Sequence, residues 1–119
     1  MRVLLTGSRE WTDHDLVQTV LDDIRRSAAG VEVMLVHGNC PAGADRIADD
    51  YWRRLELPVE THPADWDRYG RCAGPIRNAR MVGLGAALCI GFPLGRSAGT
   101  RGCIRLARAA GIPAFVFEG

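Results

Sequence analysis

Residues Ala86 to Cys103 read Ala-Ala-Leu-Cys-Ile-Gly-Phe-Pro-Leu-Gly-Arg-Ser-Ala-Gly-Thr-Arg-Gly-Cys, and the fold can be inferred from this pattern. An apolar run ends at Gly91 and Pro93, a loop of small residues with Arg96 follows, and a helical pattern begins at about Gly99. The order predicts a strand, a glycine-rich loop and a helix start. Such a loop leaves backbone N–H groups unpaired at the positive end of a helix dipole, so it predicts an anion site, most often for phosphate.

The remainder of the chain alternates in the same way between short apolar runs and helical spacing. The apolar runs predict strands over 2–6, 31–36, 58–61, 86–92 and 114–117. Helical spacing predicts helices over 12–30, 44–55, 75–84 and 99–110, the first opening with a capping box, Thr12-x-x-Asp15. Residues 63–70 read as irregular. In the third helix, 75–84, Ile76, Ala79 and Gly83 are expected to share one face.

This alternation predicts one α/β domain over residues 1–119, a three-layer sandwich with a mostly parallel five-stranded sheet. Pro58 donates no ladder hydrogen bond, so the strand over 58–61 is expected nearer an edge. Ligands of such sheets bind outside the carboxyl ends of the strands, near the point where strand order reverses. Each unusual loop of this chain follows the carboxyl end of a strand, and we expect these loops to meet at one rim.

Composition excludes several classes of function. The net charge is +1 with no basic run, which argues against a duplex nucleic-acid partner. All 15 basic residues are arginines, and a chain without lysine has neither a Schiff-base lysine for pyridoxal phosphate nor the lysine of P-loop NTPases. Arginine remains available to clamp a phosphate in bidentate fashion.

No cofactor, metal ion or membrane partner is predicted. The 4 cysteines, Cys40, Cys72, Cys89 and Cys103, lack zinc-ligand spacing and are read as small buried hydrophobic residues. The longest apolar runs are strand-sized, far short of the ~20 residues that span a bilayer. The apolar stretch near Met1 is too short for a secretory signal, so we expect a cytoplasmic protein.

The loop after the first strand offers Gly7, Ser8 and Arg9 to a ligand. Glycine allows a sharp turn, and the hydroxyl and guanidinium suit an anion; the alternative is a turn with a solvated arginine. The dinucleotide fingerprint Gly-x-Gly-x-x-Gly is missing, and the second strand ends in His37 rather than in an acid that would hold a ribose. A dinucleotide-dependent dehydrogenase is therefore not predicted.

The loop after the second strand contains Gly38 and Gly43 and leads into a helix that begins near Asp45. Asp45 either complements the dipole of that helix or accepts hydrogen bonds from ribose hydroxyls. His37 is either a proton carrier or a structural histidine that bonds neighbouring backbone. Both pairs of alternatives stay open on the sequence.

The later loops supply the remaining candidates: Asp65, Trp66, Arg77, Asn78, Ser97, Gly99 and Thr100. Asp65 and Trp66 place an acid beside an aromatic ring, which reads either as a base platform or as a loop anchored by a buried indole. Arg77 and Asn78 start a helix at the expected rim, where the alternative is a solvated face. A nucleophilic role for Ser97 or Thr100 is not predicted, because the Gly-x-Ser-x-Gly elbow is absent and no histidine follows His62.

Five ordered motifs resemble the YspA or cpYpsA-related branch of the SLOG superfamily, over nearly the whole chain. They are Gly7-Ser-Arg-x-Trp-x-Asp13, His37-Gly-x-x-x-x-Gly-Ala-Asp-x-x-Ala48, Pro63-Ala-Asp-Trp66, Ala73-Gly-Pro-x-Arg-Asn-x-x-Met-Val82 and Gly99-Thr100. The resemblance implies a Rossmann-like sheet, a pocket for a nucleotide or nucleotide-derived ligand, and a homodimer.

The same superfamily contains the Lonely guy phosphoribohydrolases, which cleave the base from a nucleoside monophosphate. Arg77 and Met81 fit their Arg-Lys-x-x-Met motif with Asn78 in place of lysine, and Gly99-Thr100 fits Pro-Gly-Gly-x-Gly-Thr-x-x-Glu with Cys103 in place of glutamate. Glycosidic cleavage needs a carboxylate, which Asp45 or Asp65 would have to supply, with Arg77 as a further catalytic candidate.

The sequence thus predicts a module that senses or sequesters a nucleoside phosphate or an ADP-ribose-type ligand. Phosphate is expected at Gly99 and Thr100 with Arg77 as a clamp, and ribose near Asp45. The alternatives are an N-glycosidic hydrolase that acts on such a ligand and, more remotely, a protein that binds single-stranded nucleic acid, against which near-neutral charge and few aromatic residues count.

Overall fold

The computed structural model describes residues 1–119. Strands and helices alternate along most of the chain in the order β1 (Arg2–Gly7), α1 (His14–Ser27), β2 (Met34–His37), α2 (Ala44–Arg54), β3 (Val59–Thr61), α3 (Trp66–Tyr69), the 3₁₀ turn η1 (Gly70–Cys72), α4 (Ala73–Gly83), β4 (Leu88–Phe92), α5 (Ala98–Ala109) and β5 (Ala114–Val116). None of the helices is both long and apolar enough to cross a membrane.

The five strands form one sheet in the order β3-β2-β1-β4-β5, and every neighbouring pair is parallel. The predicted α/β class is confirmed, with a sheet that is wholly rather than mostly parallel. Leu4 of the central strand β1 pairs with Val36 of β2 on one side and with Cys89 of β4 on the other. Strand order reverses between β1 and β4, so the loops after these strands flank the crevice where such sheets bind ligands.

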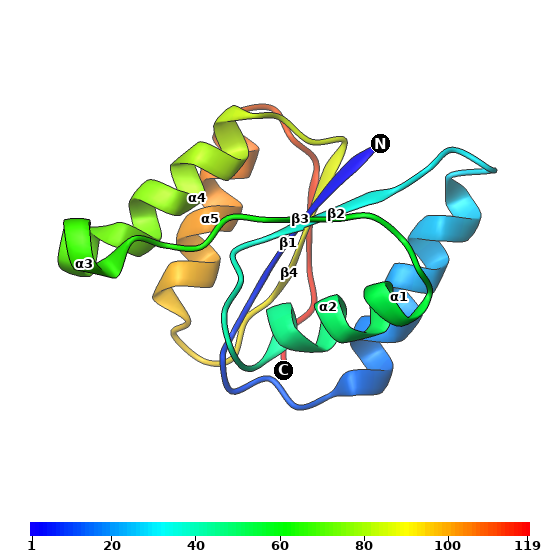
Figure 1. Ribbon diagram of the computed structural model, residues 1–119, viewed down its shortest axis with the longest axis horizontal. Helices are drawn as coiled ribbons and strands as arrows, with labels where there is room; N and C mark the ends of the chain where they lie inside the picture. The colour runs from blue at the N-terminus through cyan, green and yellow to red at the C-terminus, as the bar shows by residue number, and fades with distance from the viewer.

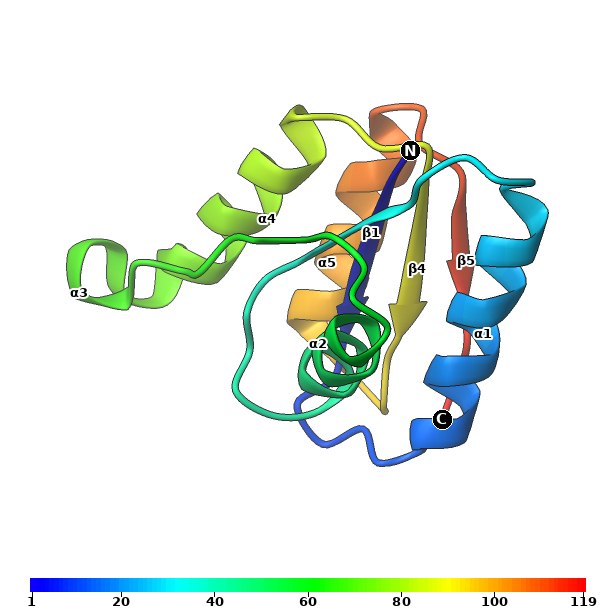
Figure 2. The same ribbon diagram turned by 45° about the vertical axis from the view of Figure 1, so that its right-hand side comes forward.

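Helices cover both faces of the sheet, with α1 and α2 on one face and α4 and α5 on the other (Figures 1 and 2). Val3 and Leu5 of β1 belong to the core under α1 and α2, and Leu4 belongs to the core under α4 and α5. Successive side chains of a strand point to opposite faces. Burial on both faces accounts for the unbroken apolar run of β1.

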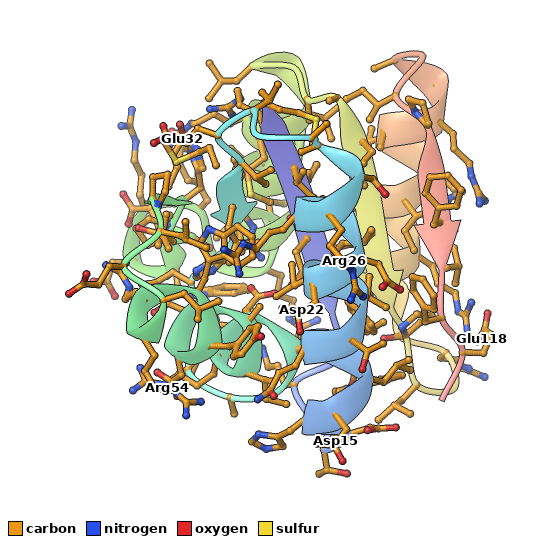
Figure 3. All side chains as sticks on the ribbon, turned by 90° about the vertical axis from the view of Figure 1, so that its right-hand side faces the viewer. Asp15, Asp22, Arg26, Glu32, Arg54 and Glu118 are labelled. Carbon is orange, nitrogen blue, oxygen red and sulfur yellow. The ribbon has the colours of Figure 1, made fainter.

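Contacts of α2 fix its position beside α1 and the sheet. The hydroxyl of Tyr51 donates a hydrogen bond to Oδ1 of Asp22 at 2.6 Å. Figure 3 shows Asp22 on the side of α1 that faces α2. Trp52 is fully buried, and its indole N–H donates to the carbonyl oxygen of Pro58 at 3.0 Å. These contacts hold the C-terminal half of α2. The N–H of Ala44 donates to the carbonyl oxygen of Ser8 at 3.1 Å and holds the N-terminal turn, which carries Asp45, beside the loop after β1.

The structure corrects the predicted start of the first helix and of the second strand. Asp13, not Thr12, caps α1, and its carboxylate accepts a hydrogen bond from the N–H of Leu16 at 3.1 Å. The second strand begins at Met34 rather than at Val31, which is exposed beyond the edge of the core. The capping pattern begins one residue before the true cap of α1, and the apolar run begins three residues before β2. Sequence patterns extend past the segment that makes the regular hydrogen bonds.

One prediction in the region after β3 is wrong. Residues 63–70 are not irregular throughout, because Asp65 caps the short helix α3 by accepting a hydrogen bond from the N–H of Arg68 at 3.1 Å. On α4, the face that Ile76, Ala79 and Gly83 share is the exposed one. The buried side chains of α4 include Asn78, Met81 and Val82. A polar residue faces inward here because its amide has a hydrogen-bond partner at the start of α5.

The cysteines follow the prediction only in part. Cys89 and Cys103 are buried, and burial raises the pKa of their thiols to about 12 and about 11, so both are neutral hydrophobic groups. Cys72 is exposed and Cys40 is half-buried. These two lie on η1 and on the loop after β2, outside the cores that the sheet and helices form.

Candidate functional site

A cavity of about 310 Å³ opens at the carboxyl edge of the sheet, at the low end of the size of ligand pockets. Most residues predicted to bind a ligand line it: Gly7, Ser8, Arg9, Gly38, Asp45, Trp66, Arg77, Asn78, Ser97, Gly99 and Thr100. His37, Gly43 and Asp65 do not line it. Residues that were not predicted to bind a ligand complete the wall: Leu5, Thr6, Glu10, Cys40, Gly74, Pro75, Met81, Leu94 and Ala98.

Two glycines permit close packing around this cavity. A Cβ atom at Gly38 would collide with the guanidinium group of Arg77. A Cβ atom at Gly43 would collide with the carbonyl oxygen of Ser8, and the φ of +77° at Gly43 also favours glycine. Gly38 and Gly43 are therefore required for packing, because only glycine lets Arg77 and Ser8 approach the backbone of this loop so closely.

His37 supports the loop that follows it through a hydrogen bond to the loop backbone. Its ring is 1% exposed, and Nδ1 accepts a hydrogen bond from the N–H of Asn39 at 3.0 Å. The other ring nitrogen, Nε2, lies 2.7 Å from Oδ2 of Asp49 and therefore donates to it in the neutral ring. Asp49 also accepts a hydrogen bond from Nε of Arg53 at 2.7 Å. This geometry favours the structural alternative for His37.

Asp45 is the buried acid of the cavity wall. It is 3% exposed, and its Oδ2 accepts a hydrogen bond from the N–H of Cys40 at 3.3 Å. Its Oδ1 is buried and has no hydrogen-bond partner. Burial raises the pKa of the Asp45 carboxyl above its usual value. A buried polar atom without a partner is costly, so an unpaired oxygen on a cavity wall points to a role in binding.

Arg77 is held by hydrogen bonds to groups from three parts of the chain. Its Nη1 donates to the carbonyl oxygen of Gly38 at 2.5 Å and to that of His62 at 3.4 Å, and its Nε donates to Oδ1 of Asn78 at 2.7 Å. The amide of Asn78 donates to the carbonyl oxygen of Gly99 at 3.3 Å. The guanidinium is thus positioned by the loop after β2 and the end of β3, and Asn78 links it to the start of α5.

The start of α5 forms another wall of the cavity. Ser97 precedes the helix with a φ of 41° and makes no side-chain capping bond, and no acidic residue lies in the first turn. Ala98, Gly99 and Thr100 line the cavity. The N–H groups of an uncapped first turn are unpaired and carry the positive end of the helix dipole, so this wall suits an anion.

Arg101 and Glu118 hold the loop that leads into α5. The two side chains make a bidentate ion pair, with N···O distances of 2.9 and 2.8 Å. The same guanidinium donates to the carbonyl oxygens of Gly95 at 2.7 Å and Arg96 at 3.1 Å. Figure 3 shows Glu118 beside β5, at the margin of the molecule. The β4–α5 loop is therefore tied to the segment after β5.

Trp66 and Arg9 form the aromatic part of the wall. Trp66 is 49% exposed, so the alternative in which its indole is a buried anchor is wrong. The guanidinium carbon of Arg9 lies 5.6 Å from the centroid of the Trp66 ring, a cation–π contact that joins the loop after β1 to α3. Asp65 serves as the cap of α3, and its carboxylate lies outside the cavity lining.

Glu10 and Cys40 line the cavity although the sequence did not predict them to bind a ligand. Oγ of Ser8 accepts a hydrogen bond from the N–H of Glu10 at 3.1 Å and donates one to the Glu10 carboxylate at 2.8 Å. Serine side chains often form such local turns with the backbone two residues on. Burial, and secondly Asp45, raise the pKa of the Cys40 thiol. The cavity therefore contains a neutral thiol beside its carboxylates and arginines.

Other parts of the surface lack such a combination of polar groups. A cavity of about 420 Å³ between α1 and the sheet is lined mainly by apolar side chains, among them Ile24, Ile90, Phe115 and Phe117. The structure contains no cluster of His, Cys, Asp and Glu side chains that could hold a metal ion. The cavity at the carboxyl edge is therefore the candidate ligand site.

Comparison with known proteins gives two similarities. The model of the YspA, cpYpsA-related SLOG family matches residues 1–69, which contain the loops after β1, β2 and β3. The Gene 61 protein of Mycobacterium phage D29 is 48% identical over 122 aligned positions, which cover 98% of this chain and 95% of that protein. No solved structure matches the chain.

Proposed function

The chain belongs to the YspA, cpYpsA-related SLOG family, and on that premise we propose that it binds a nucleotide or a nucleotide-derived ligand as a sensing or sequestering module. The ligand would be a nucleoside phosphate or a molecule of the ADP-ribose type. One observation carries this proposal: the uncapped start of α5, the anchored Arg77 and Asp45, whose buried Oδ1 has no hydrogen-bond partner, line the same cavity.

The two kinds of wall suit the two ends of a nucleotide. In the proposal the phosphate accepts hydrogen bonds from the first turn of α5, and Arg77 adds a charge-assisted contact. The base stacks on the exposed ring of Trp66, since an aromatic ring accepts the face of any base. No positive patch beyond these groups is needed, which is consistent with the net charge of +1.

Calorimetry of the purified protein with AMP, ADP, ADP-ribose and NAD tests this proposal. We expect at least one of them to bind, and Arg77→Ala to weaken that binding by at least about tenfold, the loss that a charge-assisted hydrogen bond predicts. Arg77→Lys keeps the charge but loses the planar fork. Arg80→Ala, an exposed change on the same helix, is the matched control and should leave binding unchanged. Absence of binding by all four compounds would refute the proposal.

A second candidate function is N-glycosidic hydrolysis of the same ligand. The observation that favours it is the carboxylate of Asp45 on a wall shared with Arg77, because a carboxylate stabilises an oxocarbenium-like sugar or activates water. In this reaction water adds to the anomeric carbon and the base leaves with a proton. Chromatography after incubation with AMP should then show adenine and ribose 5-phosphate. Binding without release of base above a heat-inactivated control would leave the binding module.

A further inference from the structure

Two acids on one face of α2 differ in how many of their carboxylate oxygens have a hydrogen-bond partner. Asp45 and Asp49 are four residues apart and both are buried. Asp49 has a partner for each oxygen, Arg53 for Oδ1 and the ring of His37 for Oδ2. Asp45 has a single partner, the N–H of Cys40, and its Oδ1 has none. A structural acid in this helix is thus fully paired, and Asp45 departs from that pattern where the helix meets the cavity.

An ionised Asp45 carboxylate only accepts hydrogen bonds, so the partner that its Oδ1 lacks is a donor. A phosphate group does not suit the ionised acid, because its charged oxygens are also acceptors and carry the same sign of charge. A metal ion is not favoured, since no cluster of ligating side chains surrounds the carboxylate. Burial raises the pKa of this carboxyl, and His37 and, more weakly, Arg77 act against that rise, so a further cationic group is not needed. A neutral hydroxyl group satisfies the oxygen without adding charge.

We propose that Asp45 binds a ribose hydroxyl of the ligand and thereby makes the site selective for ribonucleotides over deoxyribonucleotides. The inference rests on the proposed nucleotide-binding function and assigns the sugar specificity of the same cavity. Asp45 and Thr100 line one cavity, so the sugar lies between the carboxylate and the phosphate held at α5. A site built to accept a hydroxyl rejects a ligand without it, because its buried polar group is then left unpaired.

Calorimetry with AMP, 2′-deoxy-AMP and 3′-deoxy-AMP on the wild-type protein provides the test. We expect removal of at least one hydroxyl to weaken binding by about tenfold or more, as for a hydrogen bond to a charged group. Equal affinity for all three compounds would overturn the inference while leaving the proposed function intact. Failure of every nucleotide to bind would instead remove the proposed function.

The variant Asp45→Asn identifies the group responsible. It keeps the shape of the side chain but halves its acceptor capacity, so the ratio of AMP to deoxy-AMP affinity should fall to about twofold or less. Asp50→Asn, on the exposed side of α2 where the acid pairs with Arg46, removes the same charge and should keep the full ratio. The inference would be overturned if Asp45→Asn kept the full ratio of AMP to deoxy-AMP affinity. It would also be overturned if Asp45→Asn instead removed a preference for AMP over IMP, because Asp45 would then bind the base amine. The wild-type comparison stands even if the variant is unstable.

Discussion

Nη1 of Arg77 donates a hydrogen bond to the carbonyl oxygen of Gly38 at 2.5 Å, and no Cβ atom would fit between the two groups. The start of α4 is thereby joined to the loop after β2. Because the protein's own backbone holds the guanidinium in place, we expect the arginine to need little reorganisation when a ligand binds. Gly38 therefore contributes to the candidate site by leaving room for the guanidinium of Arg77.

Gly38→Ala should therefore reduce ligand affinity through Arg77. The added methyl group displaces the guanidinium, so binding of AMP should fall toward that of Arg77→Ala. Gly83→Ala on α4 is the control, since a Cβ atom there meets nothing within 4 Å. This control should raise the free energy of unfolding by about 0.5–1 kcal/mol and leave affinity unchanged. Calorimetry and chemical denaturation measure the two effects; full affinity in Gly38→Ala would contradict the prediction.

Ala98→Asp separates ligand binding from helix stability. The new carboxylate would lie in the first turn of α5, where the helix dipole stabilises an acid by about 0.3–1 kcal/mol. The same charge would repel a bound phosphate. We expect unchanged or slightly higher stability and AMP binding weakened by at least about tenfold, with Ala98→Asn as the uncharged control. Normal AMP binding by Ala98→Asp would place the phosphate elsewhere.

Ionisation of Asp45 should lower the free energy of unfolding, whereas ionisation of Asp49 should raise it. Burial raises the pKa of folded Asp45, so the folded chain binds more protons than the unfolded chain and stability falls as pH rises above about 4. Asp45→Asn removes this loss and should be at least as stable as wild type at pH 7. Burial also acts on Asp49, but hydrogen bonds from Arg53 and His37 outweigh it and lower its pKa.

The stabilisation from ionised Asp49 is therefore present above about pH 4 and is lost as pH falls through its folded pKa. Asp49→Asn should cost about 1–3 kcal/mol at pH 7, as expected when buried hydrogen bonds to a charged group are broken. Urea denaturation of wild type and both variants from pH 3 to 8 measures these differences. A strongly destabilised Asp45→Asn, or a neutral Asp49→Asn, would contradict the assignment.

Trp66→Ala should weaken only ligands that carry a base. Stacking on an aromatic ring contributes about 1–3 kcal/mol per base, so AMP should bind about tenfold more weakly or worse. Ribose 5-phosphate, which has no base, should bind the variant and the wild type alike. Trp66→Phe keeps an aromatic surface and serves as the conservative control. Equal losses for AMP and ribose 5-phosphate would mean that the ring shapes the cavity without stacking on the base.

The order of strands and helices could be predicted because each strand ends at a clear turn signal, such as Gly7 or the pair Gly91 and Pro93. The burial of Asn78 could not, because its inward position depends on the carbonyl oxygen of Gly99, a partner that only the packed α4 and α5 supply. Local pattern assigns apolar residues to the inner face and does not foresee a polar one with a tertiary partner.

The same limit applies to the cavity. Loops after parallel strands were expected to meet, and most of the predicted residues do line one space. The sequence places Asp45 and Asp49 on one helix face, yet nothing in their spacing tells which acid pairs with His37 and which keeps an unpaired oxygen. The predicted homodimer stays a prediction, which light scattering of the purified protein would test.

The cavity has one wall of low intrinsic stability. None of the side chains of α3 is buried, and Figure 2 shows this helix standing away from the layers that cover the sheet. Segments with few buried contacts open far more often than a core helix. Another wall belongs to α5, whose Cys103, Ile104 and Ala107 are buried. Departure of a ligand should therefore be timed by movements of the wall that carries Trp66, so residence time and equilibrium affinity can be altered independently.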